Sequence, residues 1–450
     1  MDISIVLEFV VILFCLLAGA RFGGYGLGLI SGLGLLVFVF VFHLQPGKPP
    51  IDVLLTIMSV LGCASVLQTA GGLNVMMRFA EKLLRRHPNH ITLLAPLTTW
   101  SLTVMCGTGH VVYTMFPIIY DIAIKKGIRP ERPMAVASIA SQIGICASPV
   151  SVAVVSMVAI LAKSKGLDHP ISLIELLSVG APATLCGTIA AALWSMRRGK
   201  DLDKDPEFQA KLKDPEQKQY IYGESTTLLD KVFPKEAYWA TWLFFTAIAV
   251  VVMLGAFPEL RPIVGEGAKA KALSMNLAIQ ILMLSAGALM LVLCKVRPQD
   301  IPNGTVFKAG MVAVISIFGV AWMADTVFEA HFELLKSSLA GVVAAKPWTY
   351  AIVLFIVSKL VNSQAAAIAA IAPLGVSLGV DPKVMIAFLP ACYGYFILPT
   401  YASDLACIGF DRSGTTRIGK FVINHSFIIP GLIGVGTGCT VGWLLVKVLF

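Results

Sequence analysis

The chain has 450 residues, of which 57% are hydrophobic and only 14% are charged, and its mean hydropathy is +0.82. A soluble domain is usually about 45–50% apolar and about 25% charged, so the composition excludes a soluble globular protein. The formal net charge of +9 does not indicate nucleic-acid binding, because Lys and Arg cluster in the short loops between apolar runs. We therefore predict an all-α polytopic membrane protein, since a β-barrel would alternate apolar and polar residues with a period of two.

Apolar runs long enough to cross a bilayer follow one another along the chain and predict ten to fourteen spans. Two further runs, 107–124 and 363–378, are short and interrupted. Each could be a half-helix, one arm of a re-entrant hairpin or a full span. The predicted spans cover 4–20, 26–43, 51–70, 90–106, 134–160, 171–195, 238–257, 273–294, 309–327, 348–361, 384–398 and 421–447.

Five clusters of basic residues predict the orientation, because short basic loops stay on the cytoplasmic side of a membrane. Placing all five inside agrees with the number of spans between them and puts both chain termini outside. The clusters are Arg78/Lys82/Arg85/Arg86, Lys125/Lys126/Arg129/Arg132, Arg197/Arg198/Lys200, Lys295/Arg297/Lys308 and Arg412/Arg417/Lys420.

One long polar segment, 197–237, divides the chain into two transmembrane halves, 1–196 and 238–450. Its position among the basic loops predicts a cytoplasmic linker. Two interpretations of this segment stay open: a solvated tether, or a regulatory or partner-docking surface.

An internal repeat relates 107–153 in the first half to 362–406 in the second, within wider repeats of about 90–160 and 348–409. Each copy opens with small polar residues after an apolar run and has proline inside the next apolar arm. A Gly-x-x-Pro turn follows, and then a proline beside small polar residues. The matching positions are Pro117 and Pro373, Gly127–Pro130 and Gly379–Pro382, and Ser148-Pro149 and Pro399-Thr400.

The basic loops predict that the two copies are inverted in the membrane. The first Gly-x-x-Pro turn carries basic residues and is expected inside, whereas the second, GVDPK, is expected outside. Inverted repeats with interrupted helices are typical of secondary transporters, which bind their solute near the middle of the bilayer. Half-helix N-termini offer free N–H groups and partial positive charge, so the predicted site suits an anion.

The candidate binding residues of the second copy lie at Lys359 and in the cluster Asn362, Ser363 and Gln364. Lys359 could neutralise a carboxylate of the solute, extend to the membrane interface, or pair with an acidic residue such as Asp404. The three polar side chains could donate to a solute or merely cap a helix.

In the first copy the corresponding candidates are Thr108, Gly109 and His110. The glycine lets backbone approach a ligand closely. His110 could hydrogen-bond a carboxylate or take a proton, although a lone histidine in an apolar stretch is more often a core residue with satisfied hydrogen bonds.

Further polar residues end the two copies. Ser148 ends the first, and Thr400 and Asp404 end the second. Asp404 could hold a coupling cation, pair with Lys359 or cap a helix. Arg85, Arg129 and Arg132 serve first as orientation signals, with gating or solute recruitment as the second interpretation.

No sequence pattern of an enzyme is present. There is no G-x-x-x-x-G-K-[ST] phosphate loop, no H-E-x-x-H and no G-x-S-x-G, so we expect neither ATP-driven transport nor catalysis by this chain. The nine cysteines fall in apolar runs without a CxxC pair, so no metal or cofactor is expected.

Several long strings resemble the anaerobic C4-dicarboxylate transporter (Dcu) family, most closely its B-type fumarate/succinate antiporters. The likeness spans essentially the whole chain, with one departure at Ala402, where we expect proline. The strings include EKLLRRHPNH (81–90), CGTGHVVYTMFPIIYD (106–121), VSKLVNSQAAAIAAI (357–371) and DRSGTTRIGKFVINHSFIIPG (411–431).

The resemblance implies a bacterial inner-membrane antiporter that takes in fumarate and releases succinate during anaerobic fumarate respiration, and that also carries malate and aspartate. It implies the paired hairpins of the ion-transporter superfamily, a homodimer and a C4-dicarboxylate sensor kinase as a partner. Arg85, Arg129 and Lys359 are the basic positions that match, and Thr400 to Asp404 is the acidic end that matches. Two rival functions are cation-coupled uptake of C4-dicarboxylates and a co-sensor with little flux.

Overall fold

The computed structural model describes residues 3–22, 25–49, 51–162, 171–223, 227–265, 271–331, 346–399, 401–419 and 424–450. It confirms an almost entirely helical chain with several apolar spans. Six described helices are long and apolar enough to cross a membrane, and a seventh span arises if the bent pair α3 and α4 counts as one. Four shorter apolar helices, α1, α2, α16 and α17, accompany them.

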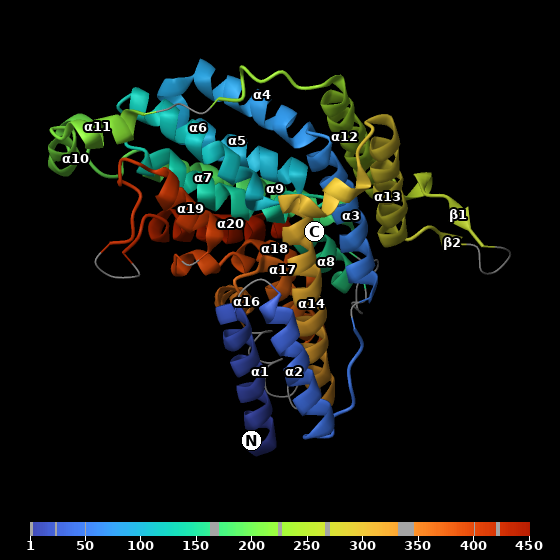
Figure 1. Cartoon of the computed structure of the whole chain (residues 1–450). Coiled ribbons are helices and arrows are strands. Elements are labelled where there is room, and N and C mark those ends of the chain that lie inside the picture. Colours follow the sequence, from blue (N-terminus) through green and yellow to red (C-terminus); the bar gives the residue numbers. More distant parts are fainter. Residues whose placement is uncertain are drawn as a thin grey trace.

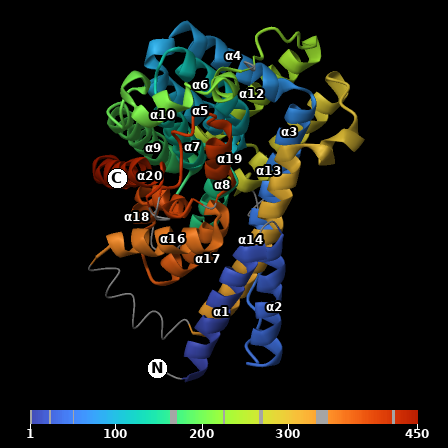
Figure 2. The same ribbon diagram turned by 60° about the vertical axis from the view of Figure 1, so that its left-hand side comes forward.

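The helices form two groups, and each group takes members from both halves of the sequence (Figure 1). Figure 2 shows α1, α2, α3 and α14 of the first group as an upright set beside the second group. The first group contains α1 (Ile3–Phe22), α2 (Gly26–Phe40), α3 (Ile51–Thr69), α12 (Lys235–Ala256), α13 (Met275–Leu293) and α14 (Thr305–Ala330). The second contains α5 (Ile91–Cys106), α6 (Val112–Lys125), α7 (Glu131–Ile143), α8 (Val152–Leu161), α9 (Leu173–Ser195), α16 (Trp348–Val361), α17 (Gln364–Ser377), α18 (Pro382–Ala387), α19 (Ala402–Phe410) and α20 (Ile428–Leu449).

The second group holds the core. Its inner helices α6, α7, α8 and α17 bury most of their residues, as expected of elements surrounded by other helices, and α9 packs along α20 of the opposite half. The first group and the outer helices of the second leave large apolar side chains exposed, including Phe14 of α1, Leu284 of α13 and Leu444 of α20. Side chains of this kind suit contact with lipid.

The remaining elements are α4, the linker helices, one short hairpin and several 3-10 turns. The helix α4 (Gly72–Arg86) bends by 70° from α3 and lies across one end of the molecule (Figure 1). The helices α10 (Pro206–Lys211) and α11 (Pro215–Tyr222) belong to the linker, and β1 (Ile263–Val264) pairs antiparallel with β2 (Lys271–Ala272). Short 3-10 helices cover Pro88–His90, Gly109–Val111, Gly144–Ala147, Leu202–Lys204, Pro258–Leu260, Pro298–Asn303, Leu389–Cys392 and Tyr395–Ile397.

The predicted span 384–398 is wrong as a continuous helix. After α18 ends at Ala387, the chain continues as two 3-10 turns, Leu389–Cys392 and Tyr395–Ile397. Pro390 cannot donate a backbone hydrogen bond, so an α-helix is not favoured to continue through it. The hydropathy of the segment indicates correctly that it is buried, but it does not indicate which secondary structure the segment adopts.

The linker is more than a solvated tether in its described part. Leu202, Phe208 and Ile221 are buried, and Tyr120 of α6 donates a 3.0 Å hydrogen bond to the carbonyl of Ile221. Near its far end, Thr227 and the amide of Leu228 donate to the buried carboxylate of Glu81 on α4. The linker is therefore folded against the second group and α4.

Candidate functional site

Each half of the second group contains a helix break of the same design. The helix α5 ends at Gly107 (φ 72°), and the next residue, Thr108, is extended and caps the following turn by accepting from the amide of His110. The helix α16 ends at Asn362 (φ 49°), and Ser363 is extended and caps α17 by accepting from the amide of Ala366. A left-handed residue followed by a hydroxyl cap thus ends one helix and begins another in both copies.

The similarity continues beyond the breaks, which supports the predicted repeat. Pro117 lies inside α6 and Pro373 inside α17. Gly127 (φ 69°) and Gly379 (φ 77°) follow the ends of these helices. In both copies a short helix and a 3-10 turn come next, and a further break precedes α8 or α19.

Both breaks border one cavity of about 550 Å³. The first contributes Thr108, Gly109 and His110, and the second contributes 362–364. The structure therefore brings together six of the predicted site residues, three from each break, although the two breaks lie 254 positions apart in sequence (362 − 108). Residues of α3 and α14 from the first group complete the wall, including Leu61, Gly310 and Ser316.

The sequence analysis missed further residues that line the cavity, among them Gln142 and Tyr395. Tyr395 donates to Gln142 Oε1 at 2.8 Å, and Gln364 Nε2 donates to the carbonyl of Gln142 at 2.8 Å. A buried amide inside an apolar run was a signal that could have indicated Gln142, because such a group must find partners in protein.

Lys359 lies behind the second break instead of lining the cavity. Its Nζ donates to Asn362 Oδ1 at 3.0 Å and to the carbonyls of Leu398 at 3.2 Å and Tyr395 at 3.4 Å. Its charge thus acts on the left-handed Asn362 and on the 3-10 segment that carries Tyr395. This arrangement makes Lys359 a positioning residue for the break.

Asp404 and Ser148 are buried but do not line the cavity. Ser138 of α7 donates to Asp404 Oδ1 at 2.8 Å, and Asp404 Oδ2 has no hydrogen-bond partner in the described part of the chain. Ser148 Oγ accepts from the amide of Val150 at 3.3 Å. Thr400 lies outside the described residues.

The three predicted gating arginines belong to ion-pair networks outside this cavity. Arg85 of α4 contacts Glu81 at 2.7 Å and Asp121 at 3.0 Å. Arg132 contacts Asp201 at 2.8 Å, and Arg129 contacts Asp205 of the linker at 2.5 Å. In the structure these three side chains therefore link different elements of the protein to one another.

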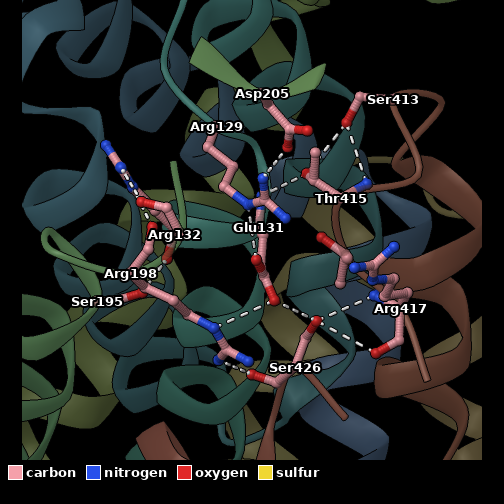
Figure 3. A network of polar contacts seen from close by, with 12 residues as sticks. Arg129, Glu131, Arg132, Ser195, Arg198, Asp205, Ser413, Thr415, Arg417 and Ser426 are labelled. Atoms are coloured by element: carbon pink, nitrogen blue, oxygen red, sulfur yellow. Dashed lines mark hydrogen bonds and ion pairs between the residues drawn. The ribbon is translucent and has the colours of Figure 1, made fainter. Parts of the chain in front are cut away.

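Figure 3 shows how Arg129 and Arg132 tie the linker to the rest of the protein. Arg129 binds Glu131 at 2.8 Å, and Glu131 in turn accepts from Ser426 at 2.7 Å and pairs with Arg198 at 3.1 Å. Partial burial would raise the pKa of Asp205, but the hydrogen bond from Arg129 and the amide of Phe208 lower that pKa below its ordinary value.

The sequence of the chain is similar to those of known membrane transporters. Residues 4–450 match a family described as the anaerobic C4-dicarboxylate membrane transporter. The chain is 55% identical over 438 residues to "Anaerobic C4-dicarboxylate transporter DcuB" of Escherichia coli O6:H1, covering 97% of each chain. It is 37% identical over 452 residues to "C4-dicarboxylate transporter DcuA" of Wolinella succinogenes, covering 99% of this chain and all of that one.

A solved structure has the same fold at low sequence identity. The YdaH transporter of Alcanivorax borkumensis aligns with 99% of this chain and 98% of its own, with a TM-score of 0.59 and 15% identity. The helices described above are therefore arranged as in a membrane transporter.

Proposed function

Since the chain belongs to the anaerobic C4-dicarboxylate membrane transporter family, we propose that it exchanges C4-dicarboxylates across a membrane, taking in fumarate and releasing succinate. Malate and aspartate are further substrates under this proposal. The observation that carries it is the single cavity bordered by both helix breaks, with Thr108 and Ser363 at their centres.

The two breaks give the cavity two similar ends. A four-carbon dicarboxylate also has two like ends, with its carboxylates ~5–6 Å apart by chain geometry. The first amides of α17 have no acceptor within their helix, and the same holds for the turn that begins at Gly109. Each carboxylate can thus receive N–H groups and hydroxyls from one break.

Backbone dipoles supply the attraction for the dianion. No Lys or Arg lines the cavity among the described residues. A helix N-terminus carries about half a positive charge, so two of them offset roughly half of a −2 solute. Such a site binds an anion through hydrogen bonds and backbone dipoles. A second dianion that arrives from the other side of the membrane can accept the same hydrogen bonds.

Under this proposal the two copies are inverted in the membrane, an arrangement that is typical of transporters that work by alternating access. Under the same proposal the chain lies in a bacterial inner membrane with both termini in the periplasm, forms a homodimer and contacts a sensor kinase. A thiol probe tests the inversion in intact cells. We expect Lys126→Cys, at the first corner, to label only from the cytoplasm, and Asp381→Cys, at the second, only from outside.

These two positions are a matched pair because both side chains are exposed at Gly-x-x-Pro corners. Replacing the exposed Cys186 by Ser first removes a competing thiol. Labelling of both corners from the same side would overturn the inverted arrangement.

The exchange itself is tested in proteoliposomes. We expect external fumarate to accelerate release of radiolabelled succinate, and Lys359→Met and Thr108→Val to slow it. Uptake driven by a sodium or proton gradient without internal dicarboxylate would instead favour cation-coupled transport. Exchange that is unchanged in both variants would show that the substrate binds elsewhere.

A further inference from the structure

Gln142 connects the two ends of the cavity. A methyl group added to Gly109 at the first break would lie only 2.4 Å from Gln142 Nε2, so the amide packs directly on that break. At the second break, Gln364 Nε2 donates to the carbonyl of Gln142 at 2.8 Å. Gln142 therefore lies between the positions proposed for the two carboxylates.

The orientation of the Gln142 amide follows from its partners. Its Oε1 accepts from Tyr395 Oη at 2.8 Å, which directs Nε2 toward Gly109. Nε2 has two hydrogens. One is directed at Ser141 Oγ at 3.3 Å, and the other has no acceptor among the residues that the structure describes. The residue is only 2% exposed, so this unused donor is buried at the cavity wall.

One partner of Gln142, the side chain of Gln364, is itself held in place by two thiols. Cys146 and Cys392 lie in corresponding 3-10 turns of the two copies, with their sulfurs 3.5 Å apart. Both donate to Gln364 Oε1, at 3.6 and 3.5 Å. The Gln364 amide is thereby held with its nitrogen toward the carbonyl of Gln142 and toward Tyr395 Oη, which lies at 3.3 Å.

We infer that Gln142 is a specificity-determining residue that reads the substituent at carbon 2 of the dicarboxylate and favours a hydroxyl over a methyl group there. This inference rests on the proposed function. A 2-hydroxyl can accept the unused Nε2 hydrogen and donate to Tyr395 Oη. A methyl group at the same carbon has similar size but cannot pair with the buried donor and excludes water from it, so the methyl analogue should bind more weakly.

The test compares two inhibitors of succinate exchange in wild-type proteoliposomes, malate and 2-methylsuccinate of matching configuration. We expect malate to inhibit at a concentration ~5- to 10-fold lower, because one net hydrogen bond distinguishes the two molecules. Equal potency of the two inhibitors would overturn the inference.

Variants then assign the effect to the residue. Gln142→Leu should remove the difference between the inhibitors, and Tyr395→Phe, which frees the amide to rotate, should reduce it. Gln280→Leu is the matched control, because Gln280 donates to Thr56 between α13 and α3 and does not line the cavity. A difference that persists in both Gln142→Leu and Tyr395→Phe would contradict the inference.

Failure of the proposed function gives a different result from failure of the inference. Wild-type protein that does not exchange succinate for fumarate would overturn the proposed function together with the inference. Normal exchange that is equally sensitive to malate and 2-methylsuccinate would overturn the inference alone.

Discussion

At the first helix break Gly107 takes a left-handed conformation with φ 72°, and at the second Asn362 does so with φ 49°. Glycine adopts this conformation without steric cost, whereas asparagine tolerates it and needs support from its surroundings. Lys359 provides that support by donating to Asn362 Oδ1. The first break is thus specified by its backbone and the second by the half-buried charge of Lys359.

The rest of the two copies differs in a similar way. The first Gly-x-x-Pro corner is tied to the linker through Arg129 and Asp205. At the second corner, Asp381 caps α18 by accepting from the amide of Lys383. The comparison indicates that one repeat is anchored at its corner by the linker, and the other at its break by Lys359.

Replacing Lys359 by Met should have the largest effect. The change leaves Asn362 Oδ1 and two backbone carbonyls without their donor, and an unsatisfied buried group costs about 1–3 kcal/mol. We expect fumarate/succinate exchange in proteoliposomes to fall by ~10²-fold. Lys447→Met, at an exposed position of α20, is the control and should exchange normally. Normal exchange by Lys359→Met would show that the second break does not depend on the charge.

Replacing Gly107 by Ala tests the first break. A Cβ there would lie 2.7 Å from the carbonyl oxygen of Val150, and the left-handed conformation adds about 1–2 kcal/mol. Gly127→Ala is a matched control, because its φ of 69° is similar and nothing lies within 4 Å of the added Cβ. We expect a larger fall in the Tm of the purified protein for Gly107→Ala. Equal falls would show that the contact with Val150 has no role.

Asn362→Gly makes the second break resemble the first. Glycine keeps the left-handed conformation but removes one acceptor of Lys359, which still binds two carbonyls. We expect exchange to fall by ~3- to 10-fold, less than in Lys359→Met. A loss as large as that of Lys359→Met would assign the anchoring to the amide of Asn362 instead of the charge.

Asp205→Asn should have the smallest effect on exchange and a clear effect on the linker. It removes the charge that pairs with Arg129, so amide hydrogen exchange of residues 202–212 should accelerate. Glu207→Gln is the control, because its pair with Arg417 is exposed and contributes little. No acceleration in Asp205→Asn would mean that the linker is held by its buried apolar residues alone.

The lowered pKa of Asp205 also gives the sign of a pH effect. A carboxyl whose pKa is lower in the folded state stabilises that state fully above its ordinary pKa of about 3.9. The linker contact should therefore persist through neutral and mildly acidic pH. It should be lost only as the pH falls through the lowered pKa.

The sequence was sufficient to predict both helix breaks, because small polar residues at Thr108 and Asn362 interrupt apolar runs. It could not predict that Gln142 and Tyr395 reach the same cavity, since both come from later turns of each copy and only packing brings them together. One interpretation placed Lys359 against the solute, whereas the structure places its ammonium group behind Asn362. Hydropathy carries no information about the side of the break on which that group lies. The interruption of the segment 384–398 was also missed, because a buried segment of 3-10 turns and a buried α-helix have the same hydropathy.

The absence of Lys and Arg from the described cavity wall has a consequence for mutagenesis. If the attraction for the substrate comes from amide groups at the breaks, every amino acid except proline supplies the same amide. An alanine scan would then leave the anion-binding element intact at each position and report only on the residues that shape it. Substituting the amide itself, with an ester bond at Gln364 or Gly109, is the change that would reach it directly.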